Sequence, residues 1–248
     1  NIILFSTEAT NKYIARHIKR GGVAVYLDEG YIHIYDKKDL KVIEVNKIPI
    51  TFNGCVKCNI ENSLAAVSAL YAAGIPSELI EMGLKTFMPD EKLNPGRFNL
   101  FDMGDFKVLL DYGHNPAGFK CVSDFVLSQK AKRYVGIIGV PGDRSNESIK
   151  ESGILCSKVF TDIYIKEDND LRGRQPGEVA QLLYDTIIDQ GFKKENVKII
   201  LSEAEALETA IKNAIPGDLI VMFYQKFNQS LKIIKSHMKS KVQEELPA

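Results

Sequence analysis

The segment from Lys107 to Phe119, KVLLDYGHNPAGF, places three polar side chains at the end of an apolar run. Asp111, His114 and Asn115 follow this run, and Pro116 comes next. Proline is favoured at the first position of a helix, where free N–H groups and the helix dipole attract anions. The sequence thus places an acid, an imidazole and an amide at a possible anion-binding helix start. The alternative is that the acid and the amide cap the helix and the imidazole is solvated.

Two further segments that follow apolar runs are rich in charge. In GVPGDRSN, Gly139 and Gly142 are expected to let the backbone approach a ligand, while Asp143 and Arg144 supply opposite charges. The second segment, IKEDNDLRGRQPGE, combines acids and arginines that could bind substrate or could form ion pairs of small energetic value with one another. Its candidate residues are Asp168, Asp170, Arg172 and Arg174.

Two amides stand at helical spacing in the earlier segment NIENSLAA. Asn59 and Asn62 are three residues apart and precede small residues, so they would share one face of a helix. Helix capping accounts for Asn59. It does not account for Asn62, which remains a candidate for ligand binding.

The elements that must position these residues fall into two parts, separated by a segment over 88–98 that contains two prolines and a glycine. We place the boundary near Leu93, which gives domains over residues 1–93 and 94–248. In the first part, a Glu29–Gly30 turn joins two alternating runs into a hairpin. The elements expected there are a strand over 2–5, a helix over 11–19, the hairpin over 21–36, and helices that end near Gly74 and Phe87.

The second part opens with a hairpin that turns at Gly104 and then alternates strands with helices. This pattern predicts a Rossmann-like α/β fold with a mostly parallel sheet covered on both faces. Ligands in such folds bind outside the carboxyl ends of the strands, where the loops described above would lie. Strands are expected over 134–139, 159–166, 197–201 and 218–224, and helices from Pro116, from about Asn146, over 176–189, over 203–214 and in the final segment.

The composition excludes several classes of function. The chain has 248 residues, of which 32 are Lys or Arg and 32 are Asp or Glu, so no overall field recruits nucleic acid or a membrane. We find no apolar run of membrane-spanning length and no signal peptide pattern. Cys55 and Cys58 form a C-x-x-C, but no second pair completes a zinc site, so we expect a cytoplasmic protein without a metal there. The composition does not decide between a monomer and a homo-oligomer.

Five motifs, in this order and at these separations, resemble the Mur ligase superfamily: NIENSLAAVSAL, NPGRFN, LLDYGHNPAGF, GVPGDR and EDNDLRGR. The first and third are widespread in that superfamily, whereas the last two are similar to its cyanophycin synthetase branch. The resemblance implies an ATP-dependent amide ligase, in which a carboxylate is phosphorylated and an amine displaces the phosphate. In that branch, it implies that arginine is joined to the β-carboxyl of aspartate in a poly-aspartate (cyanophycin) primer.

The resemblance also implies roles for residues at the nucleotide. Asn62 would lie against the nucleotide, and Arg97 would reach the ATP phosphates with a permanently charged fork. Asp111 would accept hydrogen bonds from the ribose hydroxyls, with His114 near the phosphate end. The residues implied to bind the nucleotide are Asn59, Asn62, Arg97, Asp111, His114 and Asn115, of which Arg97 and His114 would be catalytic.

The two charged segments would face the incoming arginine. Acids of the second segment would hold its guanidinium, and one of the two arginines there would hold its α-carboxylate. The residues implied to bind substrate are Asp143, Arg144, Asp168, Asp170, Arg172 and Arg174.

The phosphate-binding motif G-x-x-G-K-[ST] is absent from the 248 residues. We therefore expect the latter half of a central ATPase domain followed by a complete C-terminal ligase domain. The rest of the parent enzyme would supply the phosphate loop and the Mg²⁺ ligands, and this chain would be inactive alone. Two alternatives stay open: a peptidoglycan or folate-type ligase of the same superfamily, and a nucleotide-binding module without turnover.

Overall fold

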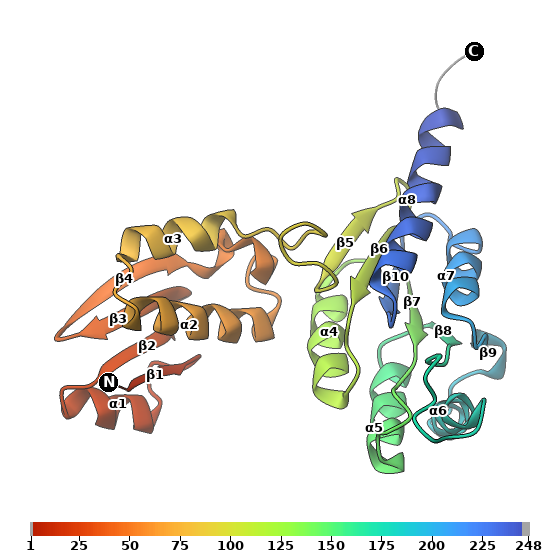
Figure 1. Cartoon of the computed structure of the whole chain (residues 1–248), viewed down its shortest axis with the longest axis horizontal. Helices are drawn as coiled ribbons and strands as arrows, with labels where there is room; N and C mark the ends of the chain where they lie inside the picture. Colours follow the sequence, from red (N-terminus) through yellow and green to blue (C-terminus); the bar gives the residue numbers. More distant parts are fainter. Residues whose placement is uncertain (1, 245–248) are drawn as a thin grey trace. The chain divides into compact units, whose positions relative to one another are not determined.

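The computed structural model describes the backbone of residues 2–244 and the side chains as far as residue 238. The chain divides into two compact units, residues 1–89 and 90–248, and each has its own sheet (Figure 1). The division falls inside the segment over 88–98 that the sequence suggests as a linker. Over the described range, no helix combines the length and the apolar character that crossing a membrane requires.

The first unit is a four-stranded sheet with helices. Over residues 2–89 its helices and strands are β1 (Ile3–Ser6), α1 (Lys12–Lys19), β2 (Val23–Asp28), β3 (Tyr31–Asp36), β4 (Lys38–Glu44), α2 (Lys57–Ala72) and α3 (Ser77–Thr86). β1 pairs with β2 in parallel, and β2, β3 and β4 form antiparallel hairpins. Glu29 and Gly30 have φ angles of 46° and 81°, as a tight two-residue hairpin turn requires. The hairpin is confirmed, whereas β4 was not predicted.

The second unit is an α/β domain. Over residues 90–244 its helices and strands are β5 (Asn99–Asp102), β6 (Lys107–Asp111), α4 (Pro116–Ser128), β7 (Arg133–Ile138), α5 (Asn146–Ser157), β8 (Asp162–Ile165), α6 (Glu178–Asp189), β9 (Val197–Ile199), α7 (Glu203–Lys212), β10 (Asp218–Phe223) and α8 (Phe227–Glu244). The strand order is β5-β6-β10-β7-β8-β9, and β5 alone among these strands runs antiparallel to its neighbour. The predicted α/β fold with a mostly parallel sheet is confirmed.

Helices cover both faces of this sheet, so its central strands are apolar on both sides. Residues 108–110 of β6 and 219–223 of β10 are all buried. α7 and α8 pack on one face, where Leu207 and Ile234 contact side chains of β6, β7 and β10. α4 packs beside α5, and α5 beside α6 (Figure 1). This closed core leaves the strand-end loops as the places where polar side chains can gather.

Candidate functional site

Because β6, β7, β8 and β10 are parallel, the loops that follow them lie at one edge of the sheet. Asp111 ends β6 and is only 3% exposed. Its Oδ2 accepts a hydrogen bond from the Phe98 N–H (3.0 Å), and its Oδ1 accepts one from the Gly113 N–H (2.8 Å). Burial raises the pKa of Asp111, while these two bonds and the nearby Arg97 and His114 oppose the rise. The Asp111 side chain therefore links the end of β6 to the turn that contains Arg97.

An exposed cation lies over an aromatic ring beside this carboxylate. The guanidinium carbon of Arg97 is 5.0 Å from the centroid of the Tyr112 ring, within the range of a cation–π contact. The His114 ring lies 4.8 Å from the Tyr112 ring, and its Nδ1 is 3.2 Å from the Tyr112 carbonyl oxygen. Arg97, Asp111 and His114, which sequence reasoning selected separately, thus come together.

The helix start after β6 has the expected capping geometry. Asn115 is the N-cap of α4, and its side chain accepts a hydrogen bond from the Gly118 N–H at 2.8 Å. Pro116 occupies the first turn. The capping alternative is confirmed for Asn115. It is wrong for Asp111, whose oxygens bond the turn before β5 and the residue just after Tyr112 instead.

Replacing Asp111 by alanine is expected to lower the free energy of unfolding by about 2–4 kcal/mol, because two buried N–H groups lose their acceptor. One of them belongs to Phe98, which has a φ of 50° and needs support in that conformation. Urea unfolding measures the change. Asp90→Ala is the matched control, since Asp90 also accepts two backbone N–H bonds but from a partly exposed position. Equal losses in the two variants would contradict the role of burial.

Ion pairs join the loops after β7 and β8. Arg172 Nη1 lies 2.6 Å from Asp143 Oδ2, and its Nε lies 4.0 Å from Asp170 Oδ2. The side-chain hydrogen bond from Arg172 holds the pKa of Asp143 below its usual value. The ion-pair alternative is confirmed for Arg172 with Asp170, but the shorter contact is with Asp143. Asp170 remains the most exposed carboxylate of the group.

Arg174, the second arginine of this segment, uses its guanidinium for hydrogen bonds within the protein. Arg174 donates from Nε to the Gly142 oxygen (2.9 Å), from Nη2 to the Arg144 oxygen (2.8 Å) and from Nη1 to Glu178 Oε1 (2.8 Å). A Cβ at Gly142 would meet the carbonyl oxygen of Leu171. The prediction that this glycine leaves room for a ligand is therefore wrong, because the neighbouring loop fills the space. Within the described residues, Arg144 Nε is buried and has no hydrogen-bond partner.

Lys166 follows β8 directly and is 2% exposed, yet its type predicts a surface position. Its Nζ lies 2.8 Å from Asp168 Oδ1 and 2.9 Å from Glu203 Oε2. A Cβ at Gly139 would meet the Lys166 side chain, so this glycine also serves packing rather than a ligand. Asp168, a predicted substrate residue, is thus paired inside the protein.

Glu203 extends this network to the last loop of the edge. Its Oε2 accepts a hydrogen bond from the Gln225 N–H (2.7 Å), and its Oε1 accepts one from the Lys226 N–H (2.9 Å). The Gln225 side chain accepts a bond from the Asn169 N–H at 3.1 Å. The loops after β8, β9 and β10 are therefore locked to one another.

Sequence reasoning missed four residues of this edge. For Lys166, the available signal was its position at the end of the largely apolar run VFTDIYIK. Glu203 reads as an ordinary first-turn acid of a helix, and Tyr112 and Tyr224 read as the ends of strands. Their roles depend on contacts between loops that are distant in the chain.

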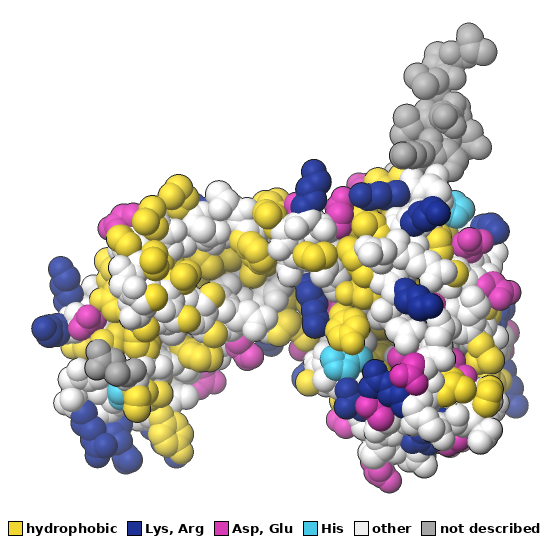
Figure 2. Space-filling model, viewed as in Figure 1, with side chains coloured by type: hydrophobic (Ala, Val, Ile, Leu, Met, Phe, Trp, Pro, Cys, Tyr) yellow, Lys and Arg dark blue, Asp and Glu magenta, His cyan; other side chains and the backbone are white. Residues whose placement is uncertain are grey.

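The two amides of the first unit lie on α2. Asn59 is buried and donates from Nδ2 to the Ile50 oxygen (2.7 Å), while its Oδ1 accepts a bond from Asn62 Nδ2 (3.3 Å). Val56 is the N-cap of α2, so the capping explanation for Asn59 is wrong. Asn62 is exposed and lines an apolar groove of about 490 Å³ between α2 and α3, with walls that include Leu70 and Leu79. Hydrophobic side chains gather over these helices in Figure 2.

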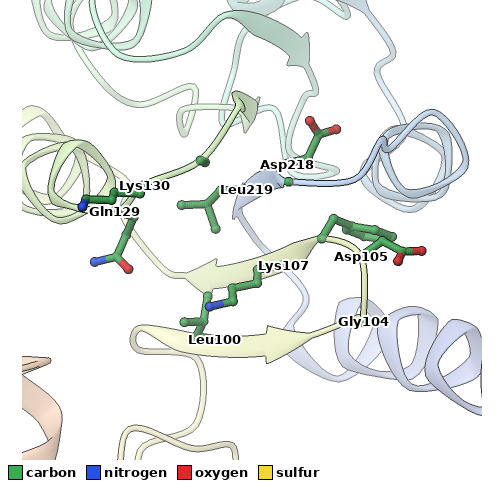
Figure 3. Close-up of a pocket in the computed structure, with 11 residues that line it drawn as sticks. Leu100, Gly104, Asp105, Lys107, Gln129, Lys130, Asp218 and Leu219 are labelled. Carbon is green, nitrogen blue, oxygen red and sulfur yellow. The ribbon is translucent and has the colours of Figure 1, made fainter.

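A second cavity lies at the opposite edge of the second unit's sheet, beside the amino ends of β6 and β10 (Figure 3). It has a volume of about 320 Å³, and Leu100, Lys107 and Lys130 line it. The Asp218 carboxylate turns away from it (Figure 3) and binds Arg133 at 2.6 Å. This cavity is remote from the loops at the carboxyl edge.

In the part of the chain that the structure describes, no group of three or more His, Cys, Asp or Glu side chains is placed to hold a metal ion. The charged side chains at this edge include Arg97 over the Tyr112 ring and the paired side chains of Asp143, Asp170 and Arg172.

Comparison with known proteins identifies the family. The family model "Mur ligase, glutamate ligase domain" matches residues 96–223. The chain is 40% identical over 241 residues to the cyanophycin synthetase of Geminocystis herdmanii, an alignment that covers 96% of this chain and 27% of that protein. It is 28% identical over 195 residues to a UDP-N-acetylmuramoyl-L-alanyl-D-glutamate–2,6-diaminopimelate ligase of Caldanaerobacter subterraneus, covering 77% of this chain and 36% of the relative. The chain thus spans about a quarter of the length of the first of these curated relatives.

A solved structure shows the same fold. E. coli FolC in complex with DHPP and ADP has a TM-score of 0.62 to this chain at 17% identity, covering 97% of this chain and 54% of FolC. At this identity the likeness supports the fold alone. The motifs, the α/β domain and the family match agree, and we conclude that the chain is a homologue of cyanophycin synthetases that belongs to the Mur ligase family.

Proposed function

We propose that this chain is part of a cytoplasmic, ATP-dependent ligase that joins arginine to the β-carboxyl of aspartate in a poly-aspartate primer. The observation that carries the proposal is the extent of the likeness to cyanophycin synthetase, which is higher in identity and coverage than the likeness to the diaminopimelate ligase. The segments GVPGDR and EDNDLRGR, which resemble the cyanophycin synthetase branch, form two charged loops. Their exposed acids suit a substrate with a cationic side chain.

Each unit, taken by itself, offers residues suited to contacting a nucleotide. Asn62 offers an amide at the rim of an apolar groove, which suits a flat base with polar edges. Arg97 makes no ion pair within the described residues, so its charge is available to phosphate oxygens. His114 lies beside it, and Asn115 contributes the N-cap of α4. Asp111 would reach the ribose only after its backbone bonds rearrange, and so we place it chiefly as the support of Arg97.

The incoming amino acid would meet the Asp143, Asp170 and Arg172 cluster. Arg174 and Asp168 are occupied by the protein itself, so of the four predicted residues of the second charged segment Asp170 and Arg172 are the accessible pair. Asp170 would bind the substrate guanidinium, and Arg172 would bind its α-carboxylate. This arrangement leaves the α-amine as the free nucleophile.

The reaction would have two steps. ATP supplies a phosphoryl group to an oxygen of the β-carboxylate, which gives an acyl phosphate and ADP. The neutral α-amine attacks the carbonyl carbon and the C–N bond forms. The C–O bond to the phosphoryl group breaks, its electron pair leaves with inorganic phosphate, and the nitrogen loses one proton to water. Arg97 would stabilise charge on the phosphates throughout. We place the Mg²⁺ ligands and the phosphate loop in the parent protein outside this chain, and we expect the chain alone not to turn over.

The test uses the full-length protein that contains this chain, with ATP, Mg²⁺, arginine and a poly-aspartate primer. We expect phosphate release that requires both arginine and primer, together with a primer mass that grows by arginine residues. Phosphate release that requires glutamate or diaminopimelate instead would support a folate-type or peptidoglycan ligase. ATP binding without turnover under any of these conditions would support a binding module.

Replacing Asp170 by asparagine in that protein is expected to raise the KM for arginine about tenfold to hundredfold, because a charged hydrogen-bond acceptor of the guanidinium is lost. The KM for ATP should stay unchanged. Steady-state kinetics with each substrate varied in turn measure both constants. Asp189→Asn is the control, since Asp189 is an exposed aspartate at the far end of α6. An unchanged KM for arginine would remove Asp170 from the site.

A further inference from the structure

The turn over residues 94–99 presents Arg97 and is held by side chains rather than by regular structure. Within the turn, Asn99 is 1% exposed, and its amide bonds three backbone groups at 2.7–3.1 Å. The turn also accepts a hydrogen bond from the loop that follows β10, in addition to its bond with Asp111. The Tyr224 hydroxyl, just after β10, donates to the Gly96 oxygen at 3.0 Å. The backbone just before Arg97 is therefore hydrogen-bonded to the residue that follows β10.

Tyr224 also packs against the ring that carries the Arg97 guanidinium. Its ring centroid lies 5.7 Å from that of Tyr112 and 5.4 Å from that of Phe227. Such tilted aromatic pairs stabilise a fixed arrangement of rings. Tyr224 thus contacts both the backbone next to Arg97 and the surface on which the side chain of Arg97 rests.

Gly96 shows how closely Tyr224 approaches the turn. A Cβ at Gly96 would overlap the Tyr224 hydroxyl, and Gly96 has a φ of 74°, which favours glycine. Burial raises the pKa of Tyr224 to about 12, although Arg97 acts in the opposite direction. The hydroxyl therefore keeps its proton and remains a donor to the Gly96 oxygen at neutral pH.

We propose that Tyr224 is a positioning residue that fixes the orientation of Arg97. Its catalytic consequence rests on the proposed function, because Arg97 is there assigned to the nucleotide phosphates. The ordering of Arg97 itself is a property of the chain and needs no substrate. Tyr224→Phe is a clean probe, since it removes the hydroxyl and keeps the ring that packs on Tyr112.

The first measurement is the order of the Arg97 side chain by NMR. The heteronuclear NOE of the Arg97 Nε–Hε group reports picosecond to nanosecond motion, and Arg97→Lys identifies its signal by removing it. We expect this NOE to fall in Tyr224→Phe, while Arg133, which binds Asp218 at the opposite edge, keeps its value. An Arg97 signal with unchanged NOE and chemical shift in Tyr224→Phe would overturn the proposal.

The second measurement is a double-mutant cycle in the full-length protein. Tyr224→Phe is expected to raise the KM for ATP about tenfold and to leave the KM for arginine unchanged. In an Arg97→Ala background, Tyr224→Phe should change the KM for ATP by less than about twofold, because Tyr224 acts through Arg97. Equal effects in both backgrounds would overturn the positioning role. If the unaltered protein releases no phosphate, the proposed function fails, and the NMR result still decides whether Tyr224 orders Arg97.

Discussion

Replacing Lys166 by methionine is expected to lower the free energy of unfolding by about 3–5 kcal/mol, because the buried Asp168 carboxylate and the largely buried Glu203 carboxylate lose their shared cation. Asp168 and Glu203 lie within 2.9 Å of Lys166 Nζ, and Lys166 itself is 2% exposed. Methionine has a similar length and fills most of the same space, so the loss reflects charge more than volume. Urea unfolding followed by circular dichroism measures it.

Two further variants separate charge from packing. Lys235→Met removes the exposed cation that pairs with Glu91 at 2.9 Å, and it should change stability by no more than about 1 kcal/mol. Adding Asp168→Asn and Glu203→Gln to Lys166→Met should recover part of the loss, since the uncompensated charges are removed. A loss below about 1 kcal/mol for Lys166→Met alone would show that the buried network does not hold the loops together.

Replacing Arg97 by alanine in the full-length protein is expected to lower kcat by about 10²–10³-fold, the usual cost of removing one group that stabilises charge in the transition state. Arg97→Lys should also be impaired, because an ammonium cannot make two parallel bonds to a phosphate. Phosphate release at saturating ATP and arginine measures kcat directly. Since the Arg97 side chain is exposed, stability should change by no more than about 0.5 kcal/mol.

Arg16→Ala is the control for this substitution. Arg16 is an exposed arginine on α1 in the first unit, so its loss removes the same charge from a surface without a proposed role. Its kcat should match that of the unaltered protein. A kcat for Arg97→Ala within about threefold of the unaltered protein would exclude a catalytic role for Arg97.

Much of the fold follows from local patterns in the sequence. The Glu29–Gly30 turn and the Asn115–Pro116 helix start are local signals that the structure confirms. β4 escaped prediction because residues 38–41 of this strand are exposed and the strand has no regular apolar alternation. The strand order could not be predicted either, because alternating strands and helices are compatible with several orders of a parallel sheet.

The candidate site was predicted less completely than the fold. Arg97, Asp111 and His114 stand close to the ends of β5 and β6, so a hairpin and a strand end already bring them together. The partners of Asp168 lie elsewhere: Lys166 points inward, and Glu203 comes from a helix 35 residues further on. No local spacing encodes such a contact, because it depends on which loops meet when the sheet forms. The role of Tyr224 at Gly96 has the same origin, because the two residues are 128 positions apart in the sequence.

The position of β10 has a consequence for how the second unit is made on the ribosome. β10 follows the other strands of its sheet in the sequence but lies between β6 and β7, which do not pair with each other. Until residues 218–223 leave the exit tunnel, β6 and β7 lack the strand with which both pair in the folded sheet, and unpaired strand edges are prone to aggregation. The sheet can therefore close, and Tyr224 can reach the Arg97 turn, only after β10 has emerged. Release of a chain truncated before β10 would leave both halves as targets for chaperones and proteases.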